Sequence, residues 1–248
     1  MEELNFTKEE LEKLDIFNKG GFEGKIYVYD DNLLIKAFMP YLKGILDFEE
    51  KRLKLIRLHE KNIDDNILIH PKKLVIVDGE FEGYVMKKLN EGKTINSIQN
   101  FKKLVYLYKK LFEKLEVVHD NNIIIRDVKP ENIVVEKNEP IFIDVDSMGV
   151  DELKADHEGH LSPISKKIPN IYEKVKYNNE KEIDKLKLLA CFICSINQNK
   201  GTIYKRLMES NLSDKFKREI SKIFKADKNL NISQNIHDLF EEEVRKIK

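Results

Sequence analysis

The chain has 248 residues, 41% hydrophobic and 35% charged, which is enough for one large domain or for two lobes that share a core. Its 44 Lys and Arg residues balance its 44 Asp and Glu residues, so no net charge draws it to nucleic acid or to a membrane surface. Met1–Leu4 forms no apolar signal core, and the apolar stretch Leu188–Ile196 is too short to span a bilayer, so we expect a cytoplasmic protein.

The N-terminal part of the chain predicts strands and short helices. Thr7 and Glu10 fit a capping box, which predicts a helix at about 8–15. Residues 20–38 predict a strand, a turn and a returning strand that carries Lys36, where an unpaired charge would be costly. The start of this segment contains Gly20, Gly21 and Gly24, and glycine allows a backbone to approach phosphate oxygens closely.

A helix is expected at about 42–58. Helical spacing puts Glu49 on one face with apolar residues, and Glu50 lies at the edge of that face. A glutamate in an inward-facing apolar stripe needs a cationic partner, whereas two solvated helix charges remain the alternative. The apolar residues of this face are Leu42, Ile45, Leu46, Leu53 and Ile56.

The remaining elements follow from hydrophobic periodicity. Residues 73–79 and 82–89 predict two strands, and the stripe from Phe101 to Val118 predicts a long helix. Residues 180–197 predict an apolar helix that begins near Asp184. Cys191 and Cys194 lie inside this helix, where we interpret them as buried reduced thiols and not as a redox pair.

The most informative segment is 123–146. Its apolar runs at 133–135 and 141–143, joined by a turn, predict a hairpin, and acids placed where such strands end can converge on one point. Phosphoryl transfer needs such a convergence, because it requires a positioned hydroxyl and a metal ion between phosphates. Asp127 can accept the hydroxyl proton, Lys129 can neutralise the transferring charge, and Asn132 and Asp144 can hold the metal.

The run Arg126–Asn132 resembles the R-D-x-K-P-E-N catalytic loop of eukaryotic-like Ser/Thr protein kinases. Two departures mark a divergent member: Ile125 stands where the family has histidine, and Asp144-Val145-Asp146 stands where it has Asp-Phe-Gly. The resemblance covers about residues 18–240. It implies an α+β, bilobal fold, with a five-stranded antiparallel small lobe at 1–89 and a mainly helical large lobe at 90–248.

The resemblance also implies an ATP site between the lobes. Lys36 would bind the α- and β-phosphates and pair with a helix glutamate, for which we choose Glu49 over Glu50. Asp127 would be the catalytic base beside Lys129, Asn132 and Asp144 would bind Mg²⁺ with Asp146 as the alternative ligand, and Asp184 would hold the catalytic-loop backbone. The other ATP-binding residues would be Gly21, Gly24, Ile26, Leu34, Met86, Lys88 and Val134.

The expected activity is ATP- and Mg²⁺-dependent phosphorylation of Ser or Thr hydroxyls in proteins, with neither a nucleic-acid partner nor a membrane span. Lys129 favours Ser/Thr over Tyr acceptors by the family pattern. A small-molecule kinase of the same fold and a nucleotide-binding pseudokinase scaffold remain the alternatives. Residues 147–170 would form the activation segment, and Arg126 would receive a phosphoserine from it.

Overall fold

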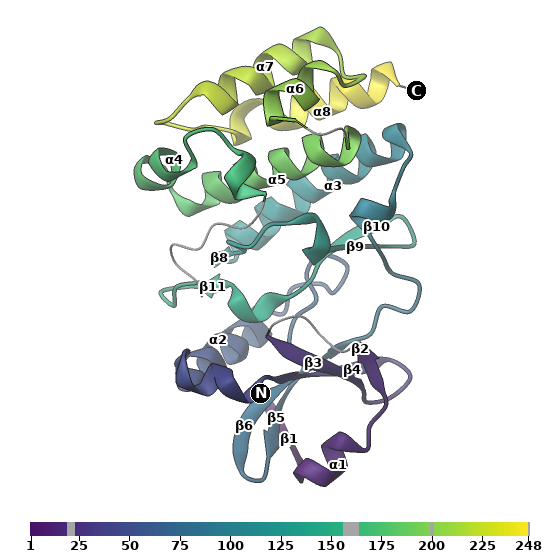
Figure 1. Cartoon of the computed structure of the whole chain (residues 1–248), viewed down its shortest axis with the longest axis vertical. Coiled ribbons are helices and arrows are strands. Elements are labelled where there is room, and N and C mark those ends of the chain that lie inside the picture. Colours follow the sequence, from purple (N-terminus) through teal and green to yellow (C-terminus); the bar gives the residue numbers. More distant parts are fainter. Residues whose placement is uncertain (19–22, 156–163, 199–200, 248) are drawn as a thin grey trace.

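The computed structural model describes residues 1–18, 23–155, 164–198 and 201–247 (Figure 1). The fold is α+β. A sheet built from the N-terminal residues lies at one end of the molecule, and the C-terminal helices lie at the other end. Short strands and the long helices α3 (Phe101–Asp120) and α5 (Glu180–Ile196) lie between them.

The N-terminal sheet has six strands in the order β1-β5-β6-β4-β3-β2. Every neighbouring pair is antiparallel except β1 and β5, which are parallel. The prediction of a five-stranded antiparallel sheet was therefore wrong. The strands are β1 (Glu2–Phe6), β2 (Ile16–Asn18), β3 (Gly24–Val28), β4 (Leu33–Phe38), β5 (Lys73–Val77) and β6 (Glu80–Lys87).

The unexpected strand β1 is held by packing on one of its faces. Leu4 and Phe6 alternate with polar residues and pack against a small core that includes Ile35 and Val75. Alternation of this kind suits a strand with one buried face, but five residues that begin with two glutamates carry a weak signal. The pairing of β1 with the edge of β5 therefore decides its structure.

The predicted capping box is confirmed. The Thr7 side chain accepts a hydrogen bond from the Glu10 N–H, and the Glu10 carboxylate accepts one from the Thr7 N–H. The helix α1 (Lys8–Glu12) ends earlier than the expected residue 15, because Ile16–Asn18 leave it to form the edge strand β2.

The second helix differs from its prediction in both extent and orientation. Residues 40–44 form a 3₁₀ turn (η1, Pro40–Gly44), and α2 (Phe48–Glu60) begins after Asp47, whose side chain caps the N–H groups of Glu49 and Glu50. The buried face of α2 carries Lys51, Lys54, Leu55 and Leu58. The apolar face assigned to Glu49 was wrong, since Ile45 and Leu53 on it are exposed.

The strands predicted at 73–79 and 82–89 and the helices predicted from Phe101 and at 180–197 are present as β5, β6, α3 and α5. The predicted hairpin is confirmed: Ile133 pairs with Phe142 and Glu136 with Glu139. The strands of this part are β7 (Lys93–Thr94), β8 (Ile123–Ile124), β9 (Ile133–Glu136), β10 (Glu139–Phe142) and β11 (Gly149–Val150). The helices are α3 and α5, with α4 (Ile171–Tyr177), α6 (Ile203–Met208), α7 (Asp214–Lys225) and α8 (Ser233–Lys246). The short 3₁₀ turns are η2 (Ile95–Ser97), η3 (Pro130–Asn132), η4 (Val145–Ser147) and η5 (Ser165–Lys167).

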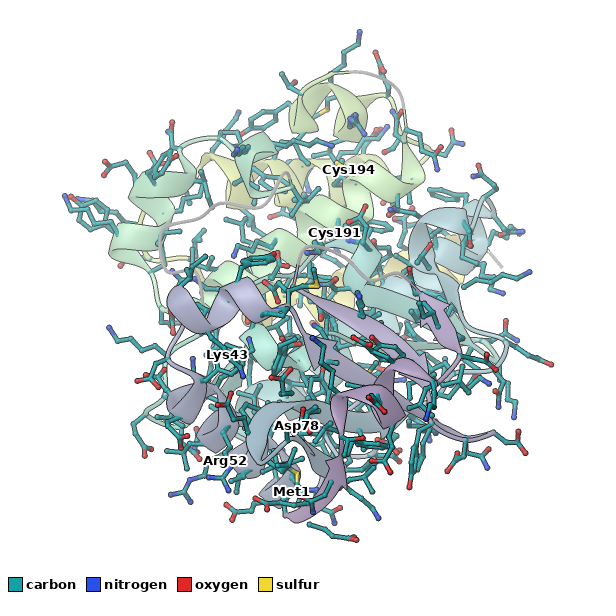
Figure 2. The ribbon with its side chains drawn as sticks, turned by 60° about the horizontal axis from the view of Figure 1, so that its bottom comes forward. Met1, Lys43, Arg52, Asp78, Cys191 and Cys194 are labelled. Carbon is teal, nitrogen blue, oxygen red and sulfur yellow. The ribbon has the colours of Figure 1, made fainter. Side chains whose placement is uncertain are left out.

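The large core forms where α3, α5 and α8 pack together. Phe192 of α5 lies 5.2 Å from Tyr108 and 5.0 Å from Phe240 between ring centroids. Cys191 is buried and Cys194 is half-buried on the same helix, and both are free thiols, in the half of the molecule away from Met1 (Figure 2). Within the described ranges, no helix combines the length and the apolar character needed to cross a bilayer.

Gly83 tests how tightly the two central strands of the sheet pack. A Cβ atom on Gly83 of β6 would lie 2.0 Å from the Lys36 carbonyl oxygen of β4. We expect Gly83→Ala to lower the free energy of unfolding by about 1–3 kcal/mol, because such crowding must displace backbone. Chemical denaturation measures this change. Gly44→Ala is the control, since its Cβ would meet nothing within 4 Å, and an equal loss in both variants would contradict the argument.

Candidate functional site

A cavity of about 680 Å³ lies where the six-stranded sheet faces the β9–β10 hairpin and the loop before it. Residues from both sides line it, and most of the residues singled out from the sequence are among them. These are Gly24, Ile26, Leu34, Lys36, Met86, Asp127, Lys129, Asn132, Val134 and Asp144. Residues far apart in the chain therefore share one concave site, the usual setting for a small-molecule ligand.

The other predicted residues are not at the cavity or cannot be placed. The Glu49 side chain is 85% exposed, and its carboxylate lies 3.8 Å from the Arg52 guanidinium, so the predicted pairing with Lys36 was wrong. Lys88 does not line the cavity, although Lys87 and Leu89 do, and its N–H donates to the Asn32 carbonyl oxygen. Gly21 lies outside the described residues.

One face of α5 holds the loop that carries Asp127. The Asp184 carboxylate accepts hydrogen bonds from the N–H groups of Ile125, at 2.8 Å, and Arg126, at 2.9 Å. Lys187 donates to the Arg126 carbonyl oxygen, and the Cys191 thiol donates to that of Val128. The spacing of Asp184, Lys187 and Cys191 places them on one side of the helix. The prediction that Asp184 holds this backbone is confirmed.

Two residues near the loop act as supports. His119 is buried at the end of α3, with its Nε2 atom 3.2 Å from the Asp184 carboxylate. Arg126 adopts a left-handed backbone conformation, with φ of 60°, and its guanidinium is ion-paired with Glu180. A non-glycine residue in this region stores strain that its surroundings must hold, and such residues gather at functional sites.

Asp127 sits in a small polar group at the floor of the cavity. Its Oδ2 atom accepts hydrogen bonds from Lys129 Nζ at 2.5 Å and from Asn132 Nδ2 at 3.3 Å. Burial alone would lower the pKa of Lys129, but the hydrogen bond and the charge of Asp127 outweigh it and raise that pKa. Asn132 Nδ2 also donates to the Asp127 carbonyl oxygen, so its amide oxygen is the atom left to accept or coordinate.

The acidic partners of Lys36 are two aspartates. Its Nζ atom lies 2.5 Å from Oδ1 of both Asp144 and Asp146. Asp146 has further partners, because Lys51 Nζ lies 3.1 Å from its Oδ2 atom and the Tyr84 hydroxyl donates to its Oδ1 atom at 3.1 Å. The residue of α2 that reaches this site is therefore Lys51, which is 1% exposed, and not a glutamate.

The two aspartates have different surroundings. Asp146 is fully buried; burial would raise its pKa, but the charges of Lys36 and Lys51 lower it well below its usual range, so this carboxylate stays ionised. Burial raises the pKa of Asp144, an effect that Lys36 opposes and the negative charge of Asp146 reinforces. Asp144 has a left-handed φ of 68°, and its side chain is 32% exposed. Of the two acids, only Asp144 lines the cavity.

Sequence reasoning missed Lys51 and Tyr84. Lys51 precedes the buried Leu55 and Leu58 by four and seven positions, which is the spacing of one helix face. Tyr84 precedes the cavity residue Met86 by two positions in β6, and alternate residues of a strand share a face. Both spacings can be read from the sequence, but a charged side chain gave no reason to expect that Lys51 would be buried.

The cavity offers oxygen ligands that suit a hard cation. No cluster of three or more His, Cys, Asp and Glu side chains able to hold a metal occurs in the described part of the chain. Magnesium bound with phosphates takes only one or two carboxylates from the protein. The Asp144 carboxylate and the Asn132 amide oxygen, which line the same cavity, are a donor set of that kind.

Comparison with protein-family models and with curated proteins found no match to this chain.

The ion pairs around the buried Asp146 predict that Lys51 and Glu49, two positions apart in α2, contribute unequally to stability. We expect Lys51→Met to lower the free energy of unfolding by about 3 kcal/mol, because it removes one cation from the buried Asp146 carboxylate. Glu49→Gln should change it by less than about 0.5 kcal/mol, as for other exposed pairs. Equilibrium denaturation compares the two, and a larger loss for Glu49→Gln would contradict the assignment.

Proposed function

We propose that the protein is an ATP- and Mg²⁺-dependent phosphotransferase that phosphorylates Ser or Thr hydroxyls of proteins, as a divergent protein kinase. The observation that carries this proposal is the convergence of Lys36, Asp127, Lys129, Asn132 and Asp144 on one cavity. Phosphoryl transfer requires these groups together: cations for the phosphates, oxygens for a metal and a base for the acceptor hydroxyl.

The proposal includes a bilobal, kinase-like organisation, with a small lobe at 1–89 and a large lobe at 90–248. The supporting features are a sheet with α2 at one end of the molecule and a mainly helical remainder (Figure 1). Residues of both parts line the cavity. The small lobe would have six strands, because β1 adds to the edge of β5.

The cavity has an apolar and a charged portion, which suits a nucleotide. Ile26, Leu34, Met86 and Val134 would pack against the adenine ring. Lys36 would bind phosphate oxygens, with its charge secured by the two aspartates that raise its pKa against the effect of burial. Asp144 and Asn132 would hold Mg²⁺, which would neutralise charge on the β- and γ-phosphates.

Asp127 and Lys129 would act on the acceptor. The Asp127 carboxylate would take the proton of the acceptor hydroxyl. The hydroxyl oxygen would form a bond to the γ-phosphorus as the bond between that phosphorus and the ADP oxygen breaks. Lys129, 2.5 Å from Asp127, would stabilise negative charge on the transferring group. The bonds of Asp184 to the loop backbone keep Asp127 in position without contact with the substrate.

A nucleotide-binding scaffold is the second candidate. It is favoured by the arrangement around Lys36, which is neutralised by Asp144 and Asp146 instead of by a helix glutamate. A small-molecule kinase of the same fold is a variant of the first proposal, and it differs only in the acceptor.

The Asp127→Asn variant separates these functions. We expect it to lower phosphoryl transfer from ATP by at least about a hundredfold, because the amide cannot take the hydroxyl proton. Transfer of the γ-phosphate to the protein itself, to a generic protein and to small-molecule pools is measured with radiolabelled ATP. Asp238→Asn, an exposed residue of α8, is the matched control. If only small molecules are labelled, the acceptor is a small molecule and not a protein. Equal transfer by Asp127→Asn and Asp238→Asn would refute the role of Asp127.

The metal assignment predicts a difference in the effect of Mg²⁺ on nucleotide binding. With Asp144→Asn, we expect the extra thermal stabilisation that Mg²⁺ adds to that of ATP alone to fall by more than half, because the variant loses the anionic ligand. Thermal unfolding with ATP, with and without Mg²⁺, measures this increment. Asp238→Asn should keep it, and an unchanged increment in Asp144→Asn would place the metal elsewhere.

A further inference from the structure

A second cavity, of about 600 Å³, adjoins the first. Lys129 and Glu131 line both cavities, so the loop that carries Asp127 separates them. The rest of the wall comes from η2, the η5 region, the C-terminal part of α5 and α6, and it includes Lys167, Cys194 and Arg206. Nothing in the proposed nucleotide site uses this second space.

The charged groups around the second cavity are mainly positive. Of the described residues that line it, Lys129, Lys167 and Arg206 are basic and Glu131 is acidic. Lys129 is ion-paired with Asp127, so the surplus comes from Lys167 and Arg206. The Glu131 carboxylate accepts a hydrogen bond from the uncharged Asn96 Nδ2 at 3.0 Å, and among the described residues it forms no ion pair with Lys167 or Arg206. The whole chain has equal numbers of basic and acidic residues, so this local surplus does not follow from composition.

Arg206 is held in place at the wall of this cavity. Its Nη1 atom donates to the Asn197 carbonyl oxygen at 3.1 Å, and its Nε atom donates to that of Gly201 at 3.3 Å. Both partners are neutral carbonyl groups, and within the described residues no carboxylate pairs with this guanidinium, which has five N–H donors in all. A fixed guanidinium of this kind suits recognition of a carboxylate.

The half-buried thiol of Cys194 reports the same positive environment. Burial raises its pKa, while the positive charges of Lys167 and Arg206 act in the opposite direction. Lys167 of η5 and Arg206 of α6 line the cavity together with Cys194, and both act on its thiol, so the two cations converge on this part of the wall. Two convergent cations favour a negatively charged ligand over a neutral one.

We infer that the second cavity binds the acceptor segment of a protein substrate, and that it selects Ser or Thr residues flanked by aspartate or glutamate side chains. This inference rests on the proposed function. Asp127 lines the first cavity, but its carboxylate lies 2.5 Å from Lys129 Nζ, and Lys129 lines both cavities. With nucleotide in the first cavity, an acceptor hydroxyl would therefore approach Asp127 past Lys129 from the second. Acidic flanking side chains would then lie against Lys167 and Arg206.

The test uses the full chain and peptides that share one central Ser and differ only in their flanks, which are Asp/Glu, Asn/Gln or Lys/Arg. We expect kcat/KM for the acidic peptide to exceed that for the neutral peptide by about tenfold, with the basic peptide lowest and the preference weakened by salt. Lys167→Glu and Arg206→Gln should each remove most of this preference, mainly through KM.

Lys166→Glu is the matched control, because Lys166 is an exposed lysine of the same turn that does not line the cavity. Equal rates for the three peptides, or equal losses in Lys166→Glu and Lys167→Glu, would overturn the inference. Thermal stabilisation by Mg²⁺ and ATP is measured in parallel. If it persists while no peptide is labelled, the acceptor class is wrong; if it is absent as well, the proposed function itself fails.

Discussion

The structure around the first cavity depends on one buried charge, the carboxylate of Asp146. An ionised carboxylate without water costs several kcal/mol unless cations and donors compensate for it. Lys36 from β4, Lys51 from α2 and Tyr84 from β6 supply that compensation within 3.1 Å. These residues come from three separate elements. Their contacts with the Asp146 carboxylate therefore hold the sheet, α2 and the segment after β10 together. Asp144, two residues before Asp146, is thereby fixed at the edge of the cavity.

A second buried acid fixes the opposite side of the cavity in the same way. The Asp184 carboxylate accepts hydrogen bonds from the backbone N–H groups of residues 125 and 126, and Lys187 donates one to the carbonyl oxygen of Arg126. These contacts hold a backbone that contains a left-handed arginine immediately before Asp127. Each side of the site therefore has a buried aspartate that does not line the cavity and an aspartate that does. The buried ones are Asp146 and Asp184, and those at the cavity are Asp144 and Asp127.

The distribution of charge distinguishes the two cavities, although the chain as a whole is neutral. In the first, Lys36 and Lys129 each lie 2.5 Å from aspartate oxygens, so the cations are paired and positioned. In the second, Lys167 and Arg206 face the space with one acid whose partner is an amide. Paired cations would give a defined geometry for the phosphates of the proposed nucleotide. A surplus of cations instead provides complementarity to an anionic partner.

The sequence by itself determined the features that depend on local pattern: the Thr7 capping box, the long helices α3 and α5 and the 133–142 hairpin. The support of the loop by Asp184, a long-range contact, was expected only from the kinase resemblance. Most of the site residues named from the sequence, through polar residues at strand ends and through the kinase resemblance, line the first cavity. Only the tertiary structure decided that β1 joins the sheet in parallel, that Glu49 is solvated while Lys51 is buried, and that Asp146 pairs with Lys36. The reason is physical: helical spacing allows either a glutamate or a lysine to face inward, and the choice depends on which charge the neighbouring elements can compensate.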